Sequence, residues 1–109
     1  MAKIKIGVQI RPQHSSWDAY KQAWLWADQA GVDVIYNWDH FFPLQGDPNG
    51  DHFEAWTLIA ALGAQTRQAT ISCLVHCLGY RNPALMSNMA KTTGAVGARS
   101  SGMSGWRSG

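Results

Sequence analysis

The chain has 109 residues, a formal net charge of +2 and a hydrophobic fraction of 46%, and it contains 6 tryptophans. This length allows one domain with a modest core, but it is well short of the roughly 250 residues of a complete eight-stranded α/β barrel. The aromatic content of 11% and the charged fraction of 15% exclude an intrinsically disordered chain.

The distribution of charged and apolar residues argues against two classes of partner. The basic residues are scattered rather than gathered in a stripe, so we expect no nucleic-acid binding. No apolar run approaches the roughly 20 residues of a membrane span, so we expect a cytoplasmic protein that does not bind membranes.

Cysteine and histidine spacing argues against a disulfide and a metal site. Cys73 and Cys77 fall four residues apart in a predicted strand, about 13 Å from each other, so we expect reduced thiols. His14, His52 and His76 share no metal-ligand spacing.

The first forty residues have the pattern strand, helix, strand. Residues 4–10 are apolar and β-branched, and residues 32–38 form a second apolar run. Between them, Ser15 and Asp18 suggest a capping box, and Gly31 suggests a left-handed helix end. The predicted buried stripe of this helix is Tyr20, Ala23, Trp24, Ala27 and Ala30, with Asp28 mostly off it.

Two further strand-helix pairs follow with their own boundaries. Residues 42–52 predict a long loop, residues 53–66 a helix and residues 69–78 a third strand. Asn82 and Pro83 are the preferred cap and first residue of a third helix. We expect its buried stripe to be Leu85, Met86, Met89 and Ala90, and Trp17, Trp24, Trp26, Trp38 and Trp56 to belong to the core.

The pattern changes after residue 93. Residues 94–109 contain five glycines and four serines and resemble a flexible or disordered tail. The predicted organisation is therefore three strand-helix units of an incomplete α/β barrel over residues 1–93, followed by the tail. The abrupt change suggests a truncated or frame-shifted reading frame.

The most informative stretch is the end of the second predicted strand, where Asp39 and His40 precede Pro43. Loops at the carboxyl ends of parallel strands build the ligand site of such folds. An imidazole titrates near neutral pH, so His40 could accept the proton of an alcohol, and a neighbouring carboxylate would stabilise the resulting cation. The alternative is that Asp39 caps the loop and His40 is a satisfied polar group.

Three motifs resemble the bacterial luciferase-like oxidoreductases, especially their deazaflavin (coenzyme F-420) branch. They are DHFFP at residues 39–43, HFEAWTL at residues 52–58 and YRNPAL at residues 80–85, within a resemblance that covers residues 3–93. Members of this family resemble eight-stranded barrels that transfer hydride to or from a deazaflavin or flavin such as FMN, some of them as monooxygenases with oxygen.

The resemblance also implies roles for particular residues. Asp39 would lie near the deazaflavin ring, and His40 would accept the proton of an alcohol substrate. A cis non-proline peptide bond, placed at Leu74–Val75, would lie behind the ring.

The departure from the family after residue 93 suggests a second class of function. Three strand-helix units cannot close a barrel, so outer strands would present unpaired backbone groups. We therefore expect little cofactor binding or turnover by this chain alone, and possible self-association through open sheet edges. The alternative function is a non-catalytic half-barrel interaction module or an inactive truncated product.

Overall fold

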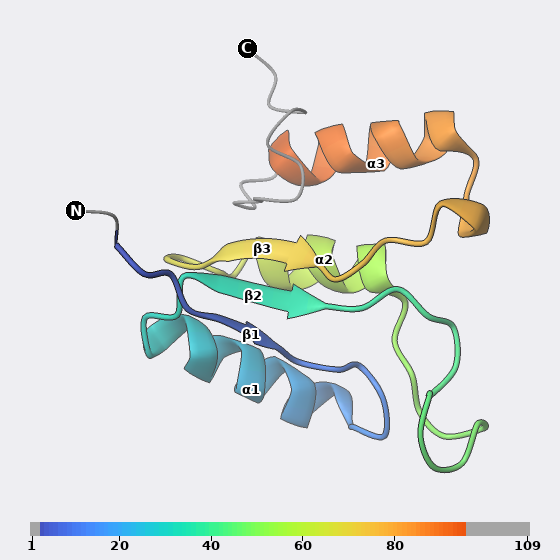
Figure 1. The fold of residues 1–109 in the computed structure, drawn as a ribbon, viewed down its shortest axis with the longest axis horizontal. Coiled ribbons are helices and arrows are strands. Elements are labelled where there is room, and N and C mark those ends of the chain that lie inside the picture. The colour runs from blue at the N-terminus through green and yellow to red at the C-terminus, as the bar shows by residue number, and fades with distance from the viewer. Residues whose placement is uncertain (1–2, 96–109) are drawn as a thin grey trace.

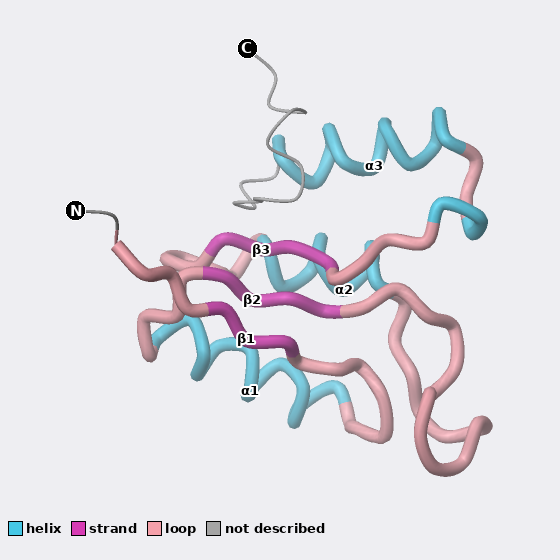
Figure 2. Tube along the Cα trace, in the orientation of Figure 1, coloured by secondary structure: helices cyan, strands magenta, loops and turns pink. Residues whose placement is uncertain are grey.

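Three short parallel strands form one sheet in a computed structural model that describes residues 3–95. The strands are β1 (Gly7–Gln9), β2 (Val34–Asn37) and β3 (Thr70–Cys73). β2 lies in the centre, with Ile35 opposite both Val8 and Ile71. The strands point the same way, and every loop from a strand to the next helix leaves from one end of the sheet (Figures 1 and 2).

Helices alternate with the strands. They are α1 (Trp17–Gln29), α2 (Ala55–Gly63) and α3 (Pro83–Ala95), and a short 3-10 turn, η1 (Leu78–Tyr80), precedes α3. Buried side chains of α1, α2 and the sheet form a single core that includes Trp24, Ile35 and Ile59. Helix α3 instead packs on α2, where Met86, Met89 and Ala90 surround Trp56. The predicted α/β class and the three strand-helix units are confirmed over these residues.

All three strands are shorter than predicted, and β2 spans Val34–Asn37 rather than residues 32–38. β1 starts at Gly7 rather than residue 4, and Ile4 and Ile6 are 85% and 61% exposed. β3 ends at Cys73 rather than residue 78, so Cys77 lies outside it, and both thiols are free. The physical reason is that an apolar run becomes a strand only where a neighbour pairs with it, and the paired residues are fewer than the apolar ones.

The helix boundaries agree better with the sequence. Ser16, not Ser15, caps α1, because its hydroxyl accepts the N–H of Ala19. Gly31 has the expected positive φ of 86°, and the Asn82 side chain caps α3 through the N–H of Ala84.

Four predicted core residues are exposed, among them Ala30 at the end of α1. Trp17 and Trp26 are exposed on α1 and Leu85 on α3, whereas Trp24, Trp38 and Trp56 are buried as expected. Periodicity alone could not place them, because the buried side of a helix depends on its neighbours. On α3 the neighbour is α2, and Thr93 takes a buried position in place of Leu85. The predicted tail lies outside the described residues from position 96 onward.

Asp28 is buried, against expectation, because its carboxylate accepts hydrogen bonds from backbone N–H groups. Its carboxylate accepts hydrogen bonds from the N–H groups of Arg67, Gln68 and Ala69 at 2.8–2.9 Å, which fixes the turn that leads into β3. Burial by itself raises the pKa of Asp28, but these three hydrogen bonds outweigh it and hold the pKa below its usual value.

The long loop after β2 closes around one side chain from the loop after β1. A His14 ring nitrogen lies 2.6 Å from the carbonyl oxygen of Gln45. A Cβ on Gly50 would lie 2.5 Å from the His14 ring, and Gly46 approaches the same ring and has a φ of +72°. The two glycines therefore leave the space that His14 fills, and the loop is built around the imidazole.

Replacing Asp28 by Ala should lower the free energy of unfolding by about 3 kcal/mol, because three backbone donors lose a charged acceptor. Asp28→Asn keeps one acceptor oxygen and should lose about half as much. Urea denaturation measures both effects. Gln29→Ala, at the adjacent exposed position, is the control, and an equal loss there would contradict the assigned role.

Replacing Gly50 by Ala should lower the free energy of unfolding by about 1–3 kcal/mol, because the new methyl group meets the His14 ring. In a His14→Ala background the same substitution should cost less than about 0.5 kcal/mol. A double-mutant cycle measured by chemical denaturation tests this, and additive losses would show that the two positions do not interact.

Candidate active site

Four consecutive residues at the carboxyl end of β2 build the centre of the site. Asn37 is the last strand residue, and its side-chain amide donates to the carbonyl of Ala55, which ties β2 to the start of α2. Trp38 and Asp39 are buried, and His40 is half-buried. Because the strand ends at Asn37, the following side chains no longer alternate between two faces.

Asp39 forms a bidentate ion pair with Arg81, which lies between η1 and α3. Arg81 donates from Nη1 to Oδ2 at 2.6 Å and from Nη2 to Oδ1 at 2.8 Å, and Cys77 donates its N–H to Oδ2 at 3.0 Å. Asp39 is 1% exposed. Burial raises the pKa of Asp39, but the hydrogen bonds from Arg81 and Cys77 outweigh it and hold the pKa below its usual value.

Glu54 brings a second carboxylate to the same guanidinium. It is the N-cap of α2, accepting from the N–H groups of Trp56 at 3.1 Å and Thr57 at 2.8 Å, and one of its oxygens also accepts from Arg81. Burial raises the pKa of Glu54, but hydrogen bonds from Thr57 and Arg81 lower it overall. The hydrogen bonds to Asp39 raise the pKa of Arg81. Burial opposes this effect, but the contact with Glu54 adds to it, so the guanidinium stays charged.

His76 completes this cluster without joining its hydrogen bonds. Its ring stacks on Trp56, with centroids 4.5 Å apart and planes 11° apart, so it is packed rather than free at the surface. Its buried Nδ1 lies 3.8 Å from Asp39 Oδ2 and has no hydrogen-bond partner. Burial lowers the pKa of His76 and outweighs the charge of Asp39, which raises it. The neutral form of the His76 ring is therefore favoured.

His40 belongs to a separate aromatic group. Its ring meets the edge of Trp38 at a centroid distance of 5.2 Å, and the Trp38 indole N–H donates to His52 Nε2 at 2.9 Å. A neutral His52 therefore carries its proton on Nδ1. Burial first, and then the charge of His40, lower the pKa of His52. No hydrogen bond or ion pair joins Asp39 to His40 in the described chain, so the carboxylate is committed to Arg81 instead.

The loop after β3 presents apolar side chains at this end of the sheet. The peptide bond between Leu74 and Val75 is cis, as the family resemblance implies, and the Val75 side chain is 66% exposed. Gln9, at the end of β1, donates to the carbonyl of Leu74 at 3.0 Å. Phe41 stacks on Tyr80 with centroids 4.0 Å apart.

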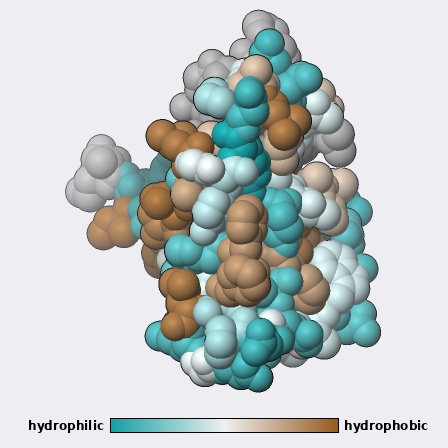
Figure 3. All heavy atoms as spheres, turned by 90° about the vertical axis from the view of Figure 1, so that its right-hand side faces the viewer, coloured by the Kyte–Doolittle hydropathy of each residue, from teal (hydrophilic) through white to brown (hydrophobic). Residues whose placement is uncertain are grey.

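Other exposed apolar residues at this end are Phe42, Leu44 and Leu78. Figure 3, which looks onto the carboxyl ends of the strands, shows hydrophobic residues between polar ones on this face. We call the exposed group formed by Phe41, Leu74, Val75 and Tyr80 the apolar face.

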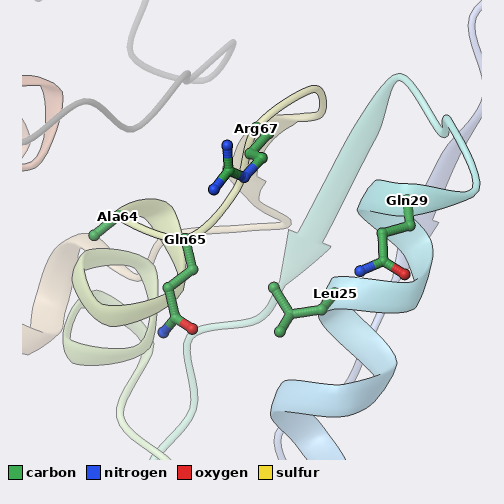
Figure 4. A pocket seen from close by; sticks show the side chains of 5 residues that line it. All are labelled: Leu25, Gln29, Ala64, Gln65 and Arg67. Carbon is green, nitrogen blue, oxygen red and sulfur yellow. The ribbon is translucent and has the colours of Figure 1, made fainter.

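A hollow elsewhere in the molecule is not part of this site. Its lining residues come from the last turns of α1 and from the segment after α2, so it lies at the amino ends of the strands (Figure 4). They are Leu25, Gln29, Ala64, Gln65 and Arg67. Arg67 is the one ionisable residue among them, which offers no acid-base pair.

Residues 3–95 contain neither a metal-binding cluster nor a membrane-spanning helix. No cluster of three or more His, Cys, Asp and Glu side chains is arranged to hold a metal ion there. No helix in that part of the chain is long and apolar enough to cross a membrane.

Comparison with known proteins gives a structural match. No protein-family model and no curated protein matches the chain. A solved structure, an F420-dependent secondary alcohol dehydrogenase in complex with an F420-acetone adduct, is similar with a TM-score of 0.74 and 25% identity over 84% of this chain. The match covers 28% of that enzyme. The likeness supports the resemblance to luciferase-like oxidoreductases and fits the strand-helix order of an α/β barrel.

The sequence does not predict the charge network around Asp39. Asp39 and His40 were singled out, whereas Arg81 and Glu54 appeared only within motifs. A usable signal was available, because charged residues that follow neighbouring parallel strands meet at one end of the sheet. Asp39 and Glu54 lie near the two ends of the connection between β2 and α2, and Arg81 follows the neighbouring strand β3.

Acid should destabilise the protein in a way that depends on Asp39. A carboxyl whose folded pKa is lowered stabilises the fold above its unfolded pKa, about 3.9, and loses that contribution as the pH falls through the folded value. Asp39→Asn should therefore flatten the fall of unfolding free energy between about pH 5 and pH 3. Urea denaturation at several pH values measures this. Asp51→Asn, in an exposed loop, is the control, and a wild-type slope in Asp39→Asn would contradict the analysis.

Proposed function

We propose that these residues form part of a luciferase-like, deazaflavin-dependent oxidoreductase site that oxidises an alcohol. The observation that supports this most is the match to an F420-dependent secondary alcohol dehydrogenase over 84% of the chain. Two variants of this function are the use of FMN in place of the deazaflavin and the oxygen-dependent monooxygenation of some relatives.

The residues at the carboxyl end suit a planar, partly apolar ring. Leu74, Val75 and Phe41 are exposed, so they can cover one side of a ring without first unpacking the core. Asp39 lies buried beneath the same end of the sheet, and Arg81 neutralises its charge. In this proposal Leu74 and Val75 back the ring and Asp39 lies near it.

His40 is the residue proposed to handle the substrate proton. A bound deazaflavin would supply the hydride acceptor for oxidation of the alcohol to a ketone or aldehyde. The hydroxyl proton must also leave, and the half-buried His40 imidazole is a side chain of the type that accepts such a proton. Trp38 supports the His40 ring from one side and is itself held by the hydrogen bond to His52.

A second candidate is a non-catalytic module that self-associates through its sheet edges. It is favoured by Ile4 and Ile6, which are exposed beside β1, and by the single partner that each outer strand has among residues 3–95. Light scattering at several concentrations tests it, since this candidate requires a dimer or larger species at micromolar concentration.

Titration of the chain with the deazaflavin coenzyme should give saturable binding with a dissociation constant above about 1 µM, equivalent to less than about 8 kcal/mol. The reason is that the three described strands can cover only one side of the ring. Visible absorption measures binding, and Val75→Asp, which places a charge on the apolar face, should abolish it. Binding that survives Val75→Asp would contradict the placement.

His40→Gln should leave deazaflavin binding unchanged and lower any rate of secondary alcohol oxidation by about 100-fold, the usual scale for loss of a general base. Reduction of the coenzyme, followed by its visible absorption, measures this rate. His14→Gln is the control because that ring is held in the loop by Gln45. A wild-type rate in His40→Gln would overturn the assigned role.

A further inference from the structure

We propose that Arg81 is a positioning residue of the candidate active site, which holds residues 74–77 in place through Asp39. This inference rests on the function proposed above and assigns a role to a residue that the sequence motifs only contain. Its basis is a set of contacts that joins the ends of two strands and the start of a helix.

The contacts converge on one carboxylate from two points of the same loop. Asp39 Oδ2 accepts both the Arg81 Nη1 donor and the backbone N–H of Cys77. The loop between β3 and α3 is therefore fastened to the end of β2 at residue 77 and again at residue 81. Residues 74–77 leave β3 at Cys73 and reach the first of these points within four residues, so their position depends on where the Asp39 carboxylate stands.

Burial makes this fastening specific for arginine. The side chains of Arg81 and Asp39 are 8% and 0% exposed, so water cannot replace a lost hydrogen bond there. The guanidinium donates to both Asp39 oxygens and also to Glu54. Lysine carries the same charge but lacks the planar fork, so it cannot serve both carboxylates in this geometry.

Glu54 fixes the direction from which Arg81 approaches. Hydrogen bonds from Trp56 and Thr57 hold its carboxylate at the start of α2, so the second contact of the guanidinium is anchored to a helix rather than to a flexible side chain. Two carboxylates around one guanidinium leave a formal charge of −1, and the neighbouring His76 ring is favoured in its neutral form. Loss of Arg81 would leave two carboxylates facing each other without a counter-charge.

The test compares Arg81→Lys and Glu54→Gln with the control Arg67→Lys, which changes an exposed arginine at the other end of the sheet. Coenzyme F-420 is the probe. Visible absorption gives its dissociation constant and the absorption maximum of the bound form, and amide hydrogen exchange reports on the Cys77 N–H. Thermal denaturation shows that each variant is folded. Should Arg81→Lys fail to fold, Glu54→Gln carries the comparison, because its one acceptor oxygen can still accept from the N–H of Thr57 at the start of α2.

We expect Arg81→Lys to raise the dissociation constant by at least about tenfold, the scale of one lost charged hydrogen bond. The bound absorption maximum should shift, and Cys77 should exchange faster, whereas Arg67→Lys should match the wild type in all three measurements. Free guanidinium should restore binding to Arg81→Ala and not to Val75→Asp.

Two outcomes count against the inference and are distinguishable. A variant that exchanges faster at Cys77, yet binds the coenzyme with the wild-type dissociation constant and absorption maximum, shows that Arg81 has a structural role only. A wild-type chain that does not bind the coenzyme at all overturns the proposed function and this inference with it.

Discussion

The ion pair between Asp39 and Arg81 holds together the carboxyl end of the sheet, where the strands alone could not. The strands are only three or four residues long, so the backbone ladder ends before the loops begin. Beyond that point the order of the chain depends on side chains. Asp39 joins the loop after β2 to the loop after β3, and Glu54 extends the connection to α2 through the same guanidinium.

Carboxylates serve the same purpose at the other end of the molecule. Asp28 accepts three backbone N–H groups before β3, and Asp33 accepts the N–H of Ile6 before β1. A short-stranded sheet leaves many backbone donors outside its ladder, and an ionised carboxylate can satisfy several of them at once. Among residues 3–95, the carboxyl end differs in that it also holds the buried Arg81 side chain beside the apolar face.

Much of the fold could be predicted because it is encoded locally. The order of elements follows from apolar periodicity and from caps such as Gly31 and Asn82, each of which acts within a few residues of itself. The role of Asp28 could not be predicted in this way, since its partners lie about forty residues further along the chain. The role of Arg81 could not be predicted locally either, because it depends on the Asp39 carboxylate, which follows a different strand.

The candidate site combines a rigid polar base with an exposed apolar surface, and this combination separates the two proposed functions. A ligand ring needs apolar side chains held at fixed positions, which the loop between β3 and α3 provides through Asp39 and Arg81. Self-association through a sheet edge needs none of this, because it uses backbone groups and exposed residues such as Ile4 and Ile6, which precede β1. Self-association through the edge would not require buried charges at the same end of the sheet as the apolar face. Their convergence therefore favours the ligand site over the edge as the functional surface.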